Sequence, residues 1–290
     1  MVEVAVNDSC FLGEGPVWDR KADTLFWVDI LKGDIHEYNP QTNSHKTIHT
    51  QQMVGAVALC ADGNLLAALK NGLAKINRQT HEISTIAHPE PDLPANRFND
   101  GKCDPAGRFW IGTMAIDETP NAGSLYMLDA NHRTTKKVEG TTISNGMAWS
   151  ADNRMFYYID TPTQTIVAYD FDNSDGGISN KRVAFKIDEK EGYPDGMTID
   201  DEGMLWVAHW NGWQVSRWNP ITGEKLFTLP MPVANVSSCT FGGEGLQDLY
   251  ITTARKDLSP DQLNQQPLAG CLFIWKNTGY KGKPAVEFNG

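Results

Sequence analysis

Short runs of hydrophobic residues recur six times along the chain, each bounded by Gly and Asp residues. The first residues of successive runs are 40, 44, 47, 49 and 44 positions apart. The runs are Leu25–Val28, Leu65–Ala68, Phe109–Gly112, Phe156–Ile159, Leu205–Ala208 and Leu249–Thr252. A period of about 40–50 residues built from short strands is typical of a β-propeller. The pattern therefore predicts an all-β chain.

The fifth copy of the repeat divides into four strands. Residues 195–200 alternate between polar and apolar, and Asp201–Gly203 follows as a hairpin turn. The hydrophobic strand 204–208 comes next, and 214–218 and 225–229 complete the blade. The other copies follow the same order. The predicted fold is thus a six-bladed β-propeller with four-stranded antiparallel blades.

The repeats occupy nearly the whole chain, so we expect one domain over residues 1–290. The ring of blades must close, and Val2–Val6 is the candidate outer strand of the last blade. Two turn-rich excursions, Ala87–Asn96 and Arg255–Leu268, are expected as loops on a face, the first of them bordering a pocket.

Composition and charge limit the possible functions. The net charge is −11 and no basic tract is present, which disfavours nucleic-acid binding. The five cysteines are odd in number and lack a CxxC motif, which favours free thiols in a reducing compartment. No signal peptide and no apolar segment of membrane-spanning length is found. We therefore expect a cytoplasmic protein without membrane partners, as a monomer or a weak homo-oligomer.

The candidate chemistry lies where the repeats differ. The first strand of each blade lines the central channel, so equivalent positions converge on one axis. The residues before the small residue that opens this strand are Glu14, Val54, Asp100, Asn145, Asp195 and Ser237, and Asn99 adds a second amide. Taken singly, each Asp-Gly or Asn-Gly pair could be a solvated turn. As a set, the carboxylates repel one another unless some are protonated or a hard divalent cation binds.

These motifs resemble the regucalcin (senescence marker protein 30)/gluconolactonase family, in collinear order over nearly the whole chain. The matching stretches are Gly13–Trp18, Arg97–Lys102, Asp104–Arg108, Gly112–Ala115, Ile143–Gly146, Phe156–Asp160, Pro194–Met197, Leu205–Ala208 and Cys239–Gly243. The resemblance implies a six-bladed propeller that hydrolyses a sugar lactone with one divalent metal. Ca²⁺ is the first choice of ion, with Mg²⁺, Mn²⁺, Zn²⁺ and Fe²⁺ as alternatives.

The resemblance also implies roles for individual residues. Glu14, Asn145 and Asp195 would hold the metal, while Arg97 and Asn99 would hold the sugar lactone. A carboxylate just after the Gly-Thr-Met-Ala stretch would also contact the substrate, and two adjacent residues fit that position. They are Asp117 and Glu118. The pair His209–Trp210 lies outside the matched motifs, and its Trp fits a sugar-stacking role no better than a structural one.

In the expected mechanism, the metal polarises the lactone carbonyl and a carboxylate activates water, which gives an aldonic acid. Asp195 is the first candidate for the general base. A metal-bound carboxylate is a poorer base, so Asp100 remains the alternative. Two rival functions are a calcium-binding regulatory propeller without turnover and a phosphotriesterase of the diisopropylfluorophosphatase type. The sugar of the lactone partner stays open.

Overall fold

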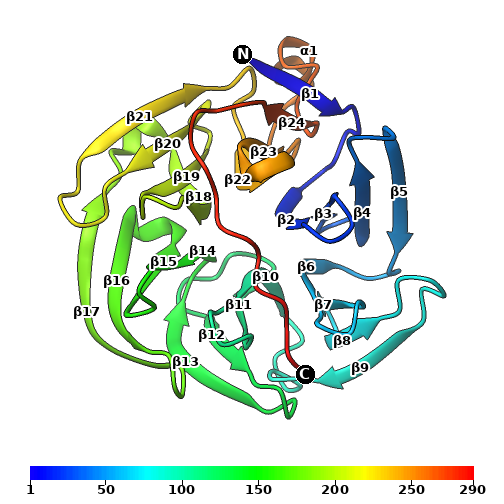
Figure 1. Cartoon of the computed structure of the whole chain (residues 1–290), viewed down its shortest axis with the longest axis vertical. Coiled ribbons are helices and arrows are strands. Elements are labelled where there is room, and N and C mark those ends of the chain that lie inside the picture. Colours follow the sequence, from blue (N-terminus) through cyan, green and yellow to red (C-terminus); the bar gives the residue numbers. More distant parts are fainter.

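Six antiparallel sheets are arranged in a ring around a central channel in the computed structural model, which describes all 290 residues (Figure 1). Each sheet has four strands, the first beside the channel and the fourth at the rim. The six-bladed propeller that the repeat predicts is therefore confirmed.

Blades 1 to 5 run from the inner to the outer strand in chain order. Blade 1 contains β2 (Gly13–Asp19), β3 (Thr24–Asp29), β4 (Asp34–Asn39) and β5 (Ser44–His49). Blade 2 contains β6 (Val54–Leu59), β7 (Leu65–Leu69), β8 (Gly72–Ile76) and β9 (Ile83–Ala87). Blade 3 contains β10 (Asn96–Cys103), β11 (Phe109–Ala115), β12 (Gly123–Leu128) and β13 (Thr134–Thr141). Blade 4 contains β14 (Ser144–Trp149), β15 (Met155–Asp160), β16 (Thr165–Asp172) and β17 (Gly177–Lys186). Blade 5 contains β18 (Tyr193–Ile199), β19 (Leu205–Trp210), β20 (Gln214–Trp218) and β21 (Lys225–Pro230).

Blade 6 closes the ring with strands from both ends of the chain. Counted outward from the channel, its first three strands are β22 (Val236–Gly242), β23 (Asp248–Thr253) and β24 (Leu272–Trp275). Its fourth, outer strand is β1 (Val2–Val6). Strand β1 runs antiparallel to β24, with Val4 opposite Phe273. The prediction that Val2–Val6 completes the last blade is confirmed, so all six blades have four strands.

Every inner strand has an irregular register with its neighbour near the start of the strand. The shifts lie between Glu14 and Val17, Val54 and Val57, Phe98 and Gly101, Ser144 and Met147, Pro194 and Met197, and Val236 and Ser238. A β-bulge bends the strand and re-aims the side chain at that point. The bulges therefore fall at the channel positions that distinguish one repeat from another.

Tight packing between neighbouring blades explains why small residues follow these bulges. A Cβ atom added to Gly146 would lie only 2.7 Å from the carbonyl oxygen of Asp195 in the next blade. This approach is too close for any larger residue, so Gly146 allows Asn145 and Asp195 to come from adjacent inner strands into the same space.

Buried aromatic residues fill the space between the sheets. Trp110 and Trp206, on the second strands of blades 3 and 5, are fully buried. Each donates its indole N–H across 2.9 Å to a buried carboxylate that follows the inner strand, Asp104 and Asp200 respectively. The repeat thus supplies each of these buried indole rings with a carboxylate that accepts its N–H hydrogen bond, as buried indoles require.

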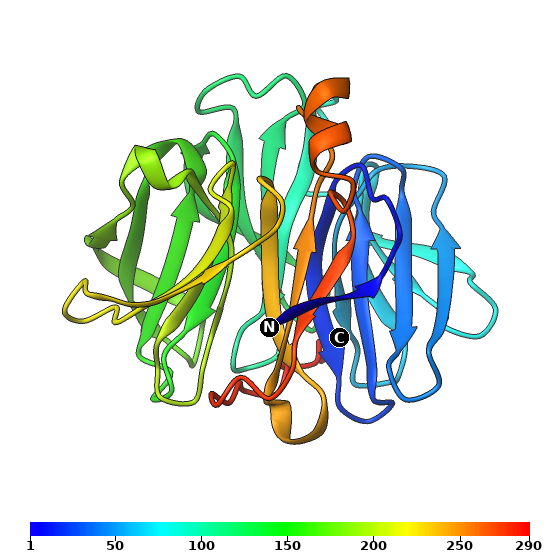
Figure 2. The same ribbon diagram turned by 90° about the horizontal axis from the view of Figure 1, so that it is seen from above.

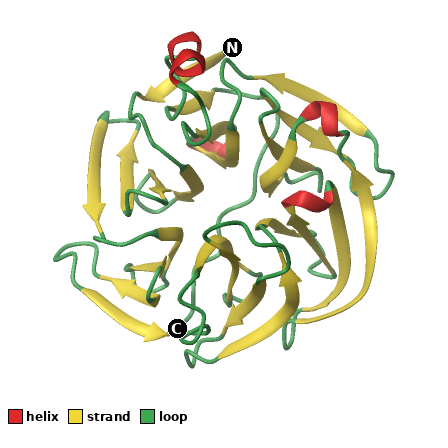
Figure 3. Ribbon diagram, turned by 180° about the vertical axis from the view of Figure 1, so that it is seen from behind, coloured by secondary structure: helices red, strands yellow, loops and turns green.

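The two ends of the channel differ. The C-terminal segment 276–290 crosses one end, whereas α1 (Pro260–Gln265) lies at the opposite end (Figure 2). The crossing segment is held by isolated bridges from Phe288 to Cys60 and from Gly282 to Asp200. Figure 3 views the end that carries α1 and the 3₁₀ turn Thr161–Thr163. No helix has the length and apolar character needed to cross a membrane.

Candidate metal centre and substrate cavity

A cavity of about 290 Å³ opens beside the bulges of three inner strands, at the end of the channel that carries α1. Glu14 on β2, Asn145 on β14 and Asp195 on β18 all line this cavity and are at most 5% exposed. Three residues from three blades thus line one cavity, each from the bulge of its own inner strand.

Hydrogen bonds fix the orientation of the Asn145 amide. The Thr161 hydroxyl donates its one proton to the carbonyl oxygen of Pro194 across 2.8 Å, so its oxygen can only accept from Asn145. The Nδ2 group of Asn145 is the donor, at 2.9 Å. The amide oxygen, Oδ1, must therefore face away from Thr161.

Two buried oxygen atoms at this place have no hydrogen-bond partner in the protein. They are Oδ1 of Asn145 and Oδ1 of Asp195. Leaving a buried acceptor unpaired costs about 1–3 kcal/mol, and more for a charged group. The adjacent strands β14 and β18 therefore present two oxygens that a bound ligand or ion would satisfy.

Three buried carboxylates give this part of the channel an excess of negative charge. Burial raises the pKa of Glu14, and the charges of Asp195 and Asp100 raise it further. Burial also raises the pKa of Asp195, with Asp100 as the next cause. The pKa of Asp100 is raised by burial as well. A bound cation would remove this penalty by stabilising the ionised forms.

The donors fit a hard divalent cation. Glu14 and Asp195 offer carboxylate oxygens, and Asn145 offers its unpartnered amide oxygen. Oxygen-only ligands are those that Ca²⁺, Mg²⁺ and Mn²⁺ prefer. Three protein residues leave coordination positions for water and substrate, which is a requirement of catalytic metal sites.

Arg97 and Asn99 form a rigid polar wall of the same cavity. The Nη1 group of Arg97 donates to the carbonyl of Phe98 at 2.9 Å and to Oδ1 of Asn99 at 2.7 Å. Nδ2 of Asn99 donates to the carbonyl of Ser144 at 2.8 Å. Burial lowers the pKa of Arg97 to about 10, so the guanidinium keeps its charge at neutral pH. The remaining N–H groups of Arg97 are in position to bind a polar ligand.

The two adjacent candidate carboxylates have different positions. Glu118 lines the cavity, and its Oε1 lies 3.1 Å from Nζ of Lys256. Asp117 is fully exposed, and its Oδ1 accepts from the backbone N–H of Thr119 at 3.1 Å and from the Thr119 hydroxyl at 2.7 Å. A left-handed backbone at Glu118, with φ of 61°, separates the two side chains.

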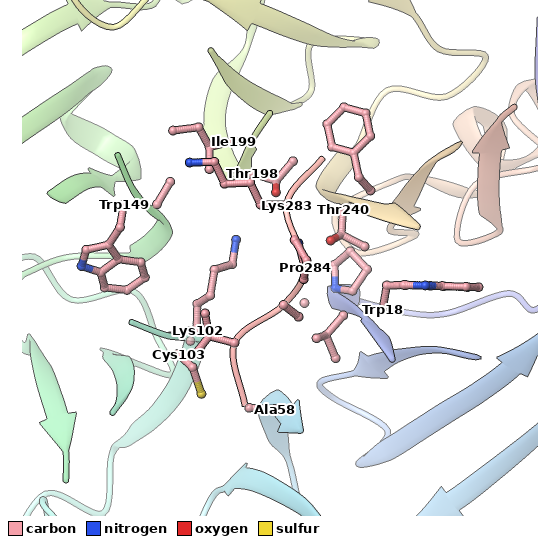
Figure 4. Close-up of a pocket in the computed structure, with 18 of the residues that line it drawn as sticks. Trp18, Ala58, Lys102, Cys103, Trp149, Thr198, Ile199, Thr240, Lys283 and Pro284 are labelled. Carbon is pink, nitrogen blue, oxygen red and sulfur yellow. The ribbon is translucent and has the colours of Figure 1, made fainter. Parts of the chain in front are cut away.

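Asp100, the alternative general base, lies deeper in the channel. It lines a second cavity of about 290 Å³ at the end crossed by the C-terminal segment. Figure 4 shows Lys102 extending into this second cavity near Lys283 and Pro284. Lys102 donates to the carbonyl of Met197 at 2.7 Å, and burial lowers its pKa. Asp100 therefore lines the second cavity together with Lys102 and does not line the first.

Several residues that line the first cavity do not occupy equivalent positions in the six repeats, so comparison of the repeats does not identify them. They are Leu12, Met114, Ile143, Thr161, Pro162, Tyr193, Trp210, Lys256 and Asp257. Lys256 and Asp257 come from the excursion 255–268, which was predicted as a loop and contains the short helix α1 in the structure. No sequence pattern connects this excursion with a pocket. The other excursion, Ala87–Asn96, borders a smaller hollow of about 150 Å³ that also includes Arg97. Trp210, left out of the predicted site, lines the cavity, with Nζ of Lys256 5.8 Å from its ring.

Comparison with known proteins gives matches over the full chain. Residues 12–255 match the model of the SMP-30/Gluconolactonase/LRE-like region. Regucalcin from Oryctolagus cuniculus is 39% identical, covering 100% of this chain and 98% of the relative. Regucalcin from Homo sapiens is 37% identical with the same coverage.

Two solved structures have the same architecture throughout. A luciferin-regenerating enzyme superposes with a TM-score of 0.94 at 34% identity, covering 100% of this chain and 99% of the other. A calcium-binding protein, regucalcin, from Agrobacterium tumefaciens superposes with a TM-score of 0.95 at 28% identity, covering 99% of this chain and 97% of the other. The propeller architecture of this chain is thus shared with both proteins over nearly their full length.

Proposed function

The chain belongs to the SMP-30/gluconolactonase/LRE-like family, and from this premise we propose that it hydrolyses a sugar lactone to the aldonic acid with the help of one divalent metal ion. The observation that carries the proposal is the pair of unpartnered oxygens on Asn145 and Asp195, beside a wall of sugar-binding groups. A cavity of about 290 Å³ is near the lower end of the range for small-molecule sites, as a monosaccharide lactone requires.

Glu14, Asn145 and Asp195 would hold the ion, with Ca²⁺ as the first candidate. When bound, the ion would supply positive charge that polarises the lactone carbonyl and stabilises the developing oxyanion. The fixed orientation of the Asn145 amide supports this arrangement, because its oxygen needs no rotation to take part.

The polar wall would position the sugar. Arg97 donates to ring hydroxyl oxygens through the N–H groups that the protein leaves free, and Asn99 keeps one N–H and one lone pair for the same purpose. Glu118 accepts a hydrogen bond from another hydroxyl through one carboxylate oxygen, while its Oε1 pairs with Nζ of Lys256. Fixing the ring in this way orients the carbonyl carbon for attack.

Asp195 is the proposed general base. It would take a proton from water through the carboxylate oxygen that does not bind the ion, as the water oxygen forms a bond to the acyl carbon. The ring C–O bond then breaks, and the leaving ring oxygen receives that proton back from Asp195. The products are one hydroxyl and one carboxyl group, so atoms balance with water as the only co-reactant. Asp100 is the alternative base, and its position in the deeper cavity favours Asp195.

A calcium-binding propeller without turnover is the second candidate, favoured by the description of the Agrobacterium tumefaciens regucalcin as a calcium-binding protein. A phosphotriesterase is less well supported, because Arg97, Asn99 and Glu118 add hydroxyl-binding groups to the apolar residues that line the cavity.

The experiment that separates these functions is a substrate panel. Aldonolactones of five and six carbons and one fluorophosphonate are offered to the calcium-loaded protein, and proton release is followed. We expect hydrolysis of at least one aldonolactone and none of the fluorophosphonate. Calcium binding without turnover of any lactone would overturn the proposal in favour of the regulatory function.

A further inference from the structure

A second group of metal-binding side chains lies at the seam where blade 6 meets blade 1, outside the channel. His36 is on β4 and His45 is on β5, both in blade 1. Asp8 lies in the segment that leaves β1, the strand that completes blade 6. The group therefore connects the segment that follows β1 to the two outer strands of blade 1.

Three potential ligand atoms converge at this place. Nδ1 of His36 lies 3.1 Å from Nε2 of His45 and 3.2 Å from Oδ2 of Asp8. The third side of the triangle, from Nε2 of His45 to Oδ2 of Asp8, measures 3.9 Å. Zinc bonds of about 2.0–2.1 Å in a tetrahedral site place the ligand atoms about 3.3 Å apart. The three atoms thus already form a face that such an ion could cap.

Hydrogen bonding alone satisfies this triangle poorly. Each neutral imidazole carries a single ring proton. One ring proton can serve only one of the contacts that Nδ1 of His36 makes. With its proton on Nε2, His36 can accept at Nδ1 from Oγ1 of Thr47 at 3.3 Å or from Nε2 of His45 at 3.1 Å. Its Nδ1 lone pair still faces a second acceptor, Oδ2 of Asp8, at 3.2 Å. An ion that accepts all three lone pairs removes this conflict, and neutral imidazole is the form that binds metals.

Neighbouring side chains hold the imidazoles in place. The indole of Trp27 is nearly parallel to both rings, at 15° and 14°, with centroid distances of 4.7 and 5.3 Å. Sγ of Cys10 lies 3.7 Å from Nε2 of His36, the nitrogen opposite the convergence point. A proton on Nε2, directed at Cys10, leaves the Nδ1 lone pair for a metal, as outer partners of ligating histidines usually do.

The group is accessible from one side. The side chain of His36 is 4% exposed, whereas those of His45 and Asp8 are 27% and 33% exposed. An ion can enter from solvent and keep a water molecule as its fourth ligand.

We propose that Asp8, His36 and His45 form a second metal site, which takes Zn²⁺ or a similar borderline ion and ties the closing strand to blade 1. Two imidazoles and one carboxylate select such ions, in contrast to the oxygen-only donors of the channel. The site stabilises the ring because the ion contacts both sides of the seam only in the folded state.

Calorimetric titration of the whole protein with Zn²⁺, in saturating Ca²⁺ to occupy the channel, tests the proposal. We expect one equivalent of Zn²⁺ to bind to the wild type, and at least about tenfold weaker binding to His45→Gln and to Asp8→Asn. The matched control is His49→Gln on the same strand, where a single histidine pairs with Asp34 at 2.6 Å. The control should bind like the wild type.

Thermal unfolding provides a second readout. Zn²⁺ should raise the melting temperature of the wild type and of His49→Gln but not of His45→Gln, while turnover with Ca²⁺ stays unchanged in all three. Absence of Zn²⁺ binding to the calcium-saturated wild type would overturn the proposal. Equal Zn²⁺ affinity in His45→Gln and the wild type would also overturn it, because the ion would then bind elsewhere.

Discussion

Thr161 accepts a hydrogen bond from Nδ2 of Asn145 at 2.9 Å and donates one to the carbonyl of Pro194, the residue before Asp195. A single hydroxyl group therefore orients one proposed metal ligand and contacts the backbone that carries another. This relationship connects the 3₁₀ turn Thr161–Thr163 to the bulges of blades 4 and 5.

Replacing Thr161 tests this orientation. Thr161→Val removes the acceptor while keeping the shape, so the Asn145 amide loses the bond that directs its oxygen into the cavity. We expect calcium affinity to fall about 10–100-fold, the usual effect of losing an outer partner of a ligand. Calcium titration measures the change. Thr161→Ser keeps the hydroxyl and should bind calcium like the wild type, and an equal loss in both variants would contradict the account.

Asp195→Asn tests the proposed base. The amide keeps the size of the side chain but cannot take a proton, so kcat should fall at least about 100-fold while the unfolding transition is retained. Kinetics at saturating calcium separate this loss from weaker metal binding. Asp100→Asn is the comparison variant, and it should lose much less turnover. A near-normal kcat in Asp195→Asn with a large loss in Asp100→Asn would transfer the role to Asp100.

Glu118→Gln and Asp117→Asn form a matched pair of charge-neutralising changes. Glu118 lines the cavity beside Lys256, whereas Asp117 is exposed and bonded to Thr119. We expect KM for the best lactone to rise about tenfold in Glu118→Gln, since a hydrogen bond to a charged group contributes about 1.5–3 kcal/mol. Asp117→Asn should leave KM unchanged. The reverse pattern would show that the loop contacts substrate through Asp117.

The channel carboxylates predict a pH dependence of the stabilisation by calcium. Burial and mutual repulsion raise the pKa of Glu14 and Asp195 above their ordinary values in the metal-free protein. The folded state then holds protons that the unfolded state releases, so stability falls as pH rises from the ordinary carboxylate pKa toward the raised one. Calcium replaces these protons.

The measurement is the difference in melting temperature between calcium-loaded and metal-free protein from pH 5 to 8. We expect this difference to grow with pH, because protons compete with calcium less at higher pH. Taking the difference cancels titrating groups away from the channel. A constant or shrinking difference would contradict the assignment of the two carboxylates as metal ligands.

Much of the fold could be predicted because a propeller repeats its hydrophobic pattern. The six aromatic or aliphatic second strands and the closing strand Val2–Val6 follow from sequence alone. The C-terminal segment 276–290 could not be predicted in the same way. It makes only isolated bridges, such as Phe288 to Cys60, and has no alternating pattern that would indicate a strand.

The candidate site likewise contains residues that the repeats predict and residues that they do not. Glu14, Asn145 and Asp195 share a register position in three repeats, so the comparison of repeats brings them together. Thr161 and Lys256 lie in turns and loops that follow the second strands, where no register relates one blade to another. The choice between Asp117 and Glu118 depends on the left-handed backbone at Glu118, which hydrophobic periodicity does not encode.

The central claim is that Glu14, Asn145 and Asp195 hold a divalent ion on which lactone hydrolysis depends. The most direct measurement is the rate of aldonolactone hydrolysis by protein stripped with EDTA and dialysed, before and after stepwise addition of Ca²⁺. The account predicts a rate near the uncatalysed background in the stripped protein and full recovery at one equivalent of bound calcium. Full activity in the stripped protein would contradict it.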